Sequence, residues 1–139
     1  MGVGPNYVLD KGFLAEGGSV EYKFGEIVVH GTALQAVARA TTVAATNSFV
    51  GVCQETVDAA KVATGKVFVD VRILGIARVI AGAAVTKGSR VTNDASARAT
   101  AVTRAGAGVQ PAHVLGIALT PAAAAGDHID VLLTPGATY

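Results

Sequence analysis

The sequence predicts an all-β fold, built as a small β-barrel or tulip-like domain. Helical periodicity is weak along most of the 139 residues, whereas short β-branched runs recur between glycines at the spacing of a barrel or sandwich. The clearest run, residues 66–74, alternates between two sets of side chains. One set is apolar and is expected to face a core: Val67, Val69, Val71 and Ile73.

The strands are predicted in chain order from such runs. They are Ser19–Phe24, Ile27–His30, Leu34–Arg39, Phe49–Gln54, Lys66–Leu74, Ala77–Ile80, Arg90–Thr92, Ala97–Val102, Val114–Leu119 and Ile129–Leu133. Between the strands at 90–92 and 97–102, the segment Asn93–Ser96 has the residue types of a tight hairpin turn. The chain is therefore expected to double back there.

An internal similarity links the middle of the chain to its end. In both places a short strand (Gly51–Cys53, Gly116–Ala118) is followed by an Ala-rich connector, a glycine, another strand and a further glycine. Either connector, 55–64 or 119–125, suits one or two turns of helix ended by the glycine after it. Two similar hairpin-like units without an evolutionary duplication explain the pattern equally well.

The first 18 residues differ from the rest and are predicted to form an extended N-terminal arm, with residues 19–139 as a single β domain. The arm contains glycines, Pro5 and Asn6 beside isolated apolar side chains. We expect it to dock on its own barrel, on a neighbouring subunit or on a larger partner. The residues taken as its contact set are Val3, Pro5, Asn6, Tyr7, Val8, Phe13 and Leu14.

Charge and hydropathy narrow the classes of partner. The formal net charge is +1, and basic and acidic side chains are mixed along the chain, so nucleic acid is not an expected partner. No apolar run reaches the ~20 residues of a membrane-spanning helix, and the N-terminus lacks the pattern of a secretory signal. With 15% charged residues, the surface is easily desolvated against another protein.

No motif for catalysis or for a cofactor is found, so we expect no enzyme, no cofactor and no metal. His30, His113 and His128 are not spaced as metal ligands, and Asp127 beside His128 is more typical of a turn. Nucleophile-elbow and phosphate-loop patterns are absent. The single cysteine, Cys53, lies in an apolar run and is interpreted as a core residue.

An ordered set of segments resembles the capsid decoration, or cement, proteins of tailed bacteriophages. The segments are Gly75–Ala99, Val114–Thr120, Ala122–Asp127 and Val131–Gly136. The resemblance covers about residues 49–136, and it implies a β-barrel or tulip-like domain on the outer face of an expanded head. It further implies attachment to the major capsid protein, commonly as a homotrimer, and an N-terminal arm that reaches the shell.

Three classes of function are therefore carried forward. The first is a capsid decoration protein, made in the host cytoplasm and located on the outer surface of the virion. The second is another virion structural protein, such as a head-completion or tail component, and the third is a small-molecule-binding or enzymatic β-barrel. A ring of higher rotational symmetry would favour the second class, and a concave pocket with converging polar groups would favour the third.

Overall fold

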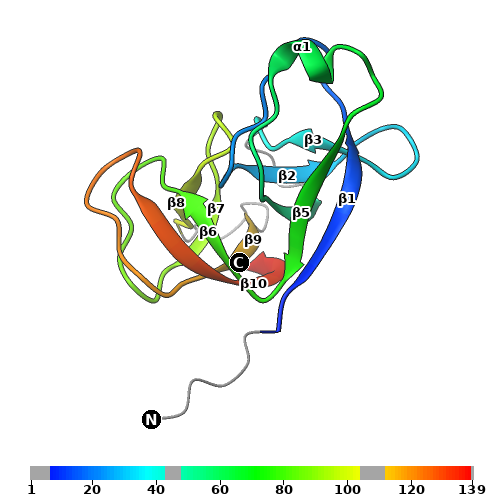
Figure 1. Ribbon diagram of the computed structural model, residues 1–139. Coiled ribbons are helices and arrows are strands. Elements are labelled where there is room, and N and C mark those ends of the chain that lie inside the picture. The colour runs from blue at the N-terminus through cyan, green and yellow to red at the C-terminus, as the bar shows by residue number, and fades with distance from the viewer. Residues whose placement is uncertain (1–6, 43–47, 104–111, 139) are drawn as a thin grey trace.

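The computed structural model describes residues 7–42, 48–103 and 112–138, and the fold of these residues is almost entirely β (Figure 1). The single helix among them is α1 (Ala59–Val62). The strands are β1 (Leu9–Ala15), β2 (Ile27–His30), β3 (Ala36–Arg39), β4 (Phe49–Cys53), β5 (Phe68–Leu74), β6 (Ile76–Ile80), β7 (Arg90–Asn93), β8 (Ala99–Ala101), β9 (Ala112–Ala118) and β10 (His128–Thr138).

The strands form one closed barrel and a second five-stranded sheet. Strands β1 to β5 close in the order β1-β3-β2-β4-β5, because β1 pairs with both β3 and β5. Strands β6 to β10 form the second sheet in the order β6-β10-β9-β7-β8. The predicted all-β class and the predicted barrel are confirmed.

The two sheets repeat the same topology, and we refer to β1–β5 as the first half and to β6–β10 as the second half. Antiparallel pairs β2–β3, β2–β4, β4–β5 and β1–β5 recur as β7–β8, β7–β9, β9–β10 and β6–β10. Isolated bridges recur too, with Tyr22–Val57 in one half and Val85–Ala122 in the other. The similarity noted in the sequence is therefore a structural repeat.

The two halves differ where the first and third strands of each half meet, a place that we call the seam. In the first half, β1 and β3 bond directly, with the Leu14 N–H donating to the Gln35 carbonyl at 2.9 Å. In the second half, residues 25–27 of the first half lie between the corresponding strands β6 and β8 and separate them. The Ile80 N–H donates to the Gly25 carbonyl at 3.0 Å, and the Ile27 N–H donates to the Ala97 carbonyl at 2.8 Å.

Beyond this insertion, the seam of the second half is bridged directly by Ala81 and Ala99, since the Gly82 N–H donates to the Ala99 carbonyl at 2.7 Å. Backbone from the first half thus completes the second. We call residues 25–27 the inserted segment.

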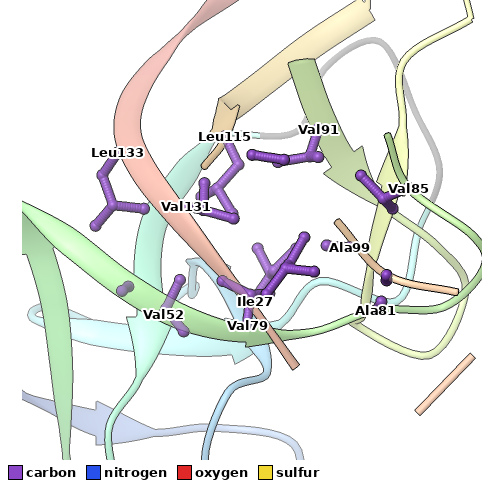
Figure 2. Packing of buried hydrophobic residues seen from close by; sticks show 14 of the residues in the cluster. Ile27, Val52, Val79, Ala81, Val85, Val91, Ala99, Leu115, Val131 and Leu133 are labelled. Atoms are coloured by element: carbon purple, nitrogen blue, oxygen red, sulfur yellow. The ribbon is translucent and has the colours of Figure 1, made fainter. Parts of the chain in front are cut away.

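Two apolar clusters fill the interior. One lies within the first half and includes Tyr22, Val28 and Val37. The other fills the second half and takes in Ile27 and Val52 from the first half, and Figure 2 shows these two among the side chains of the second half. The halves therefore share a core in addition to the seam.

Most predicted strands are present, with three differences. Residues 19–24 form no strand, because left-handed glycines at Gly17, Gly18 and Gly25 break the chain on both sides and leave Tyr22 in an isolated bridge. A strand, β1, lies inside the predicted arm. The last strand, predicted to end at Leu133, instead continues as β10 to Thr138, past a register shift between Leu133 and Gly136.

Of the two Ala-rich connectors, one contains the predicted helix and the other does not. The first contains α1 and is followed by Gly65 at φ 68°, as predicted. The second has no helix, since Ala122 pairs with Val85 and the Asp127 carboxylate accepts the N–H groups of the two alanines that follow Ala122. The predicted turn at 93–96 is confirmed, with the Asp94 carboxylate accepting the Ser96 N–H at 2.8 Å.

Candidate interaction surface

The predicted contact residues of the N-terminal arm differ in where they lie and in how exposed they are. Val3, Pro5 and Asn6 lie outside the described residues. Tyr7 and Val8 precede β1 and are exposed, Tyr7 by 79%. Phe13 and Leu14 belong to β1, where both are half-buried; Phe13 packs on the core of the first half. Residues 9–15 thus dock on the chain's own barrel, which is one of the three docking places we expected.

Large exposed apolar side chains gather where the two halves join. The start of β1, the end of β5 and part of β10 meet there, just below the centre of Figure 1. Leu9 lies directly across from Leu74, and Leu132 lies directly across from Ile76, so each pair shares a sheet face. We call this set the junction surface: Tyr7, Val8, Leu9, Leu74 and Leu132, all exposed.

Gly75 holds the junction surface together. It is the single residue between β5 and β6, and its φ of 100° is rarely adopted by other residues. A Cβ at this position would lie 2.6 Å from the Tyr7 carbonyl oxygen and 2.9 Å from Cγ1 of Val8. The segment before β1 therefore passes directly over the turn between the halves, and a side chain at residue 75 would displace it.

An ion pair lies at the centre of this region. The Arg72 guanidinium donates to the Asp10 carboxylate through Nε at 2.8 Å and Nη2 at 3.0 Å, and its Nη1 donates to the Ile76 carbonyl at 3.1 Å. Hydrogen bonds from Arg72 lower the pKa of Asp10, and those to Asp10 raise the pKa of Arg72. Because both charges are already paired, covering them with a partner leaves neither unsatisfied.

Leu9, Leu74 and Leu132 were missed as contact residues, although the sequence carries a signal for two of them. Leu74 falls on the polar side of the alternating run 66–74, and Leu132 lies between the inward-facing Val131 and Leu133. Each is thus an apolar residue where alternation predicts an exposed side chain. The contribution of Leu9 depends on the pairing of β1 with β5, which no local pattern indicates.

In the described part of the chain, the titratable side chains do not form a metal site. There, no three side chains of His, Cys, Asp or Glu lie together as metal ligands. Burial raises the pKa of the Cys53 thiol to about 11, and the thiol donates to the Glu55 carbonyl at 3.0 Å. Cys53 is therefore a protonated core residue at neutral pH, as interpreted from the sequence. No helix within residues 7–42, 48–103 and 112–138 is long and apolar enough to cross a membrane.

Comparison with known proteins gives one informative likeness. No model of a known protein family matches the chain, and no curated protein matches it. Among solved structures, the N base of the head fiber protein gp8.5 of bacteriophage phi29 is similar, with a TM-score of 0.60. The match covers 92% of this chain and 95% of that chain at 14% sequence identity. At this identity the likeness shows a shared fold.

Proposed function

We propose that the chain is a structural protein of a phage head that attaches to the outer surface of the expanded capsid and stabilises contacts between major capsid subunits. In this role it is a decoration protein without catalytic activity, and several copies act together as a homotrimer. The junction surface carries the proposal, because five of the eight large apolar side chains that are exposed in the described residues belong to it.

The physical properties of the junction surface suit attachment to another protein. Its apolar side chains gain from leaving water, and the Asp10–Arg72 pair at its centre is already satisfied. A capsid presents the same site many times, so a modest contact for each copy is strengthened when copies are linked. The shared fold with a phage head fiber base supports the setting of a phage head.

A second candidate role is the base of a longer head appendage. The similar structure favours this role, since it is the N base of a head fiber. Both roles require attachment to the head, and they differ in whether the bound protein clamps neighbouring capsid subunits. Heads that carry the protein should resist heat or loss of divalent cations better than bare heads if it is a cement, and equally well if it is only a base.

The attachment is tested by co-sedimentation of the purified protein with expanded heads that lack it. Leu74→Asp places a charge in the junction surface and should reduce bound protein at least about tenfold. Phe68→Asp is the matched control, because Phe68 is equally exposed on the same strand, at its opposite end from Leu74. Failure of the unmodified protein to bind intact expanded heads would reject the proposal, and equal binding by Leu74→Asp would reject the junction surface as its site.

A further inference from the structure

The outer face of the second half carries a row of apolar side chains that crosses three strands. Ile76 on β6 lies directly across from Leu132 on β10, and Leu132 lies directly across from Ile117 on β9. Residues paired in this way project from the same face of a sheet, with Cβ atoms about 5 Å apart. Leu132 is exposed, and Ile76 and Ile117 are half-buried, so this face points to solvent. Because Leu132 belongs to the junction surface, that surface continues along the row onto β9.

A depression lies at the β9 end of this row. Its volume is about 270 Å³, and its lining residues are Arg90, Val114, Ile117, Thr134 and Gly136. Arg90 lies directly across from Ile117 and therefore projects from the same face. Ile117 belongs both to the row and to the depression. A partner that covers Leu132 therefore reaches the depression across a single strand-to-strand spacing.

The junction surface is too small to form a complete interface, and its surroundings favour one direction of extension. Stable protein interfaces take about 20 to 30 residues from each partner. On the next row of β6 and β10, Arg78 lies across from Asp130, with Nε and Oδ1 3.6 Å apart, and both side chains are well exposed. Covering that pair would take two loosely held charges out of water. The row toward Ile117 carries no charge before Arg90 at its far end, so the contact extends more favourably over β9.

The size and the lining of the depression fit one side chain of a protein. An apolar cavity of about 150 Å³ holds a benzene molecule, whereas pockets for small-molecule ligands begin near about 300 Å³. Val114 and Ile117 supply apolar surface, and none of the lining residues is acidic. The Arg90 guanidinium is of the kind that stacks on aromatic rings. A phenylalanine or tyrosine side chain therefore suits the depression.

We propose that the partner bound at the junction surface extends across β10 and inserts one aromatic side chain into the depression. The partner is the major capsid subunit of the proposed function, and to that extent the inference rests on that function. Leu132 then lies in the middle of one continuous interface, with the junction surface on one side of it and Ile117 on the other. The depression adds an anchor point, which limits the orientations in which the protein can be bound.

Filling the depression with apolar atoms tests insertion directly. The nearest atom to a Cβ on Gly136 is the Thr134 carbonyl oxygen, 3.9 Å away, so a side chain fits there without moving the backbone. Gly136→Leu occupies the space of the inserted side chain and should raise the dissociation constant for expanded heads at least about tenfold. A partner that lies flat over this face would bind Gly136→Leu at least as well as the unmodified protein. Gly136→Ala is the matched control, because it also replaces the glycine and fills little of the depression.

A labelling measurement adds a readout that a folding defect would not imitate. Thr134 is exposed at the rim of the depression, and Thr134→Cys should react with a maleimide in the free protein and be protected when the protein is bound to heads. Cys53 is buried and does not compete. Ser19→Cys, exposed in the first half, is the control and should react equally in both states. Thermal unfolding checks that each variant is folded.

The outcomes separate this inference from the proposed function. Failure of the unmodified protein to bind expanded heads rejects the proposed function and the inference with it. Binding that is weakened by Leu74→Asp and left unchanged by Gly136→Leu rejects the inference alone, as does equal labelling of Thr134→Cys in the free and bound states. Weaker binding by both Leu74→Asp and Gly136→Leu, together with protection of Thr134→Cys, supports a single interface that includes the depression.

Discussion

Gly51 of β4 and Gly116 of β9 occupy the same position in the two halves of the repeat. A Cβ on Gly51 would lie 2.0 Å from the Arg72 carbonyl oxygen, and a Cβ on Gly116 would lie 2.0 Å from that of Leu132. Both glycines lie where two strands cross closely, and in both cases the obstacle is backbone. The repeat thus includes a glycine at the one position of each half where the neighbouring backbone leaves no room for a Cβ.

Replacing either glycine should be strongly destabilising. Gly51→Ala and Gly116→Ala force the facing strands apart, and we expect each to lower the free energy of unfolding by about 3 kcal/mol or more. The matched control is Gly12→Ala on β1, where the nearest atom to a new Cβ is 3.9 Å away. Urea unfolding of the three variants checks the prediction, which is wrong if Gly12→Ala costs as much as the other two.

The ion pair between Glu26 and Arg39 should matter more than a surface pair. Glu26 belongs to the inserted segment, its side chain is 4% exposed, and Nε of Arg39 lies 2.6 Å from Oε2. Arg39→Met leaves the buried carboxylate unpaired and should cost about 3 kcal/mol of stability. Glu26→Gln combined with Arg39→Met should cost less than Arg39→Met alone, as a double-mutant cycle by chemical unfolding will show; equal costs would mean that the charge of Glu26 is not the cause.

Stability should fall at high pH through two buried groups. Burial raises the pKa of Cys53 from 9.0 to about 11 and that of Tyr22 from 10.0 to about 12. The unfolded chain ionises first, so stability is full below about pH 9 and is lost as the pH rises toward 12, by about 2–3 kcal/mol for each group. Unfolding curves at several alkaline pH values measure the loss. Cys53→Ala should remove its earlier part, and an unchanged slope in that variant would exclude Cys53.

Removal of the segment before β1 should separate attachment from folding. Deletion of residues 1–8 takes away Tyr7 and Val8 and keeps Leu9 and Asp10, which pair with β5. We expect the fold to be retained, with a thermal midpoint within a few degrees of the full chain, and binding to expanded heads to weaken. Unchanged binding would show that Leu9, Leu74 and Leu132 suffice. Deletion through Asp10 should in addition lower the thermal midpoint, because Arg72 loses its partner.

Patterns within single strands could be predicted from the sequence, and pairings between distant strands could not. The run 66–74 alternates because one face of β5 meets the core, so Val69 and Val71 were identified correctly as buried. Strand β1 was missed because Leu9–Ala15 contains Gly12 and little alternation, and its strand form depends on β3 and β5. Tyr7 and Val8 were found as exposed apolar residues of the arm. The place of Leu132 across from Ile76 depends on the pairing of β10 with β6, which no local pattern indicates.

The inserted segment, residues 25–27, has a consequence for the order of events during synthesis. The ribosome releases the first half before the second, so the backbone that completes the seam between β6 and β8 is already in place when those strands emerge. A gene rearranged so that residues 76–138 are translated first would reverse this order. Those residues would then wait with an unpaired strand edge, a state in which chains associate wrongly. Because of the inserted segment, folding during synthesis therefore depends on the first half being made before the second.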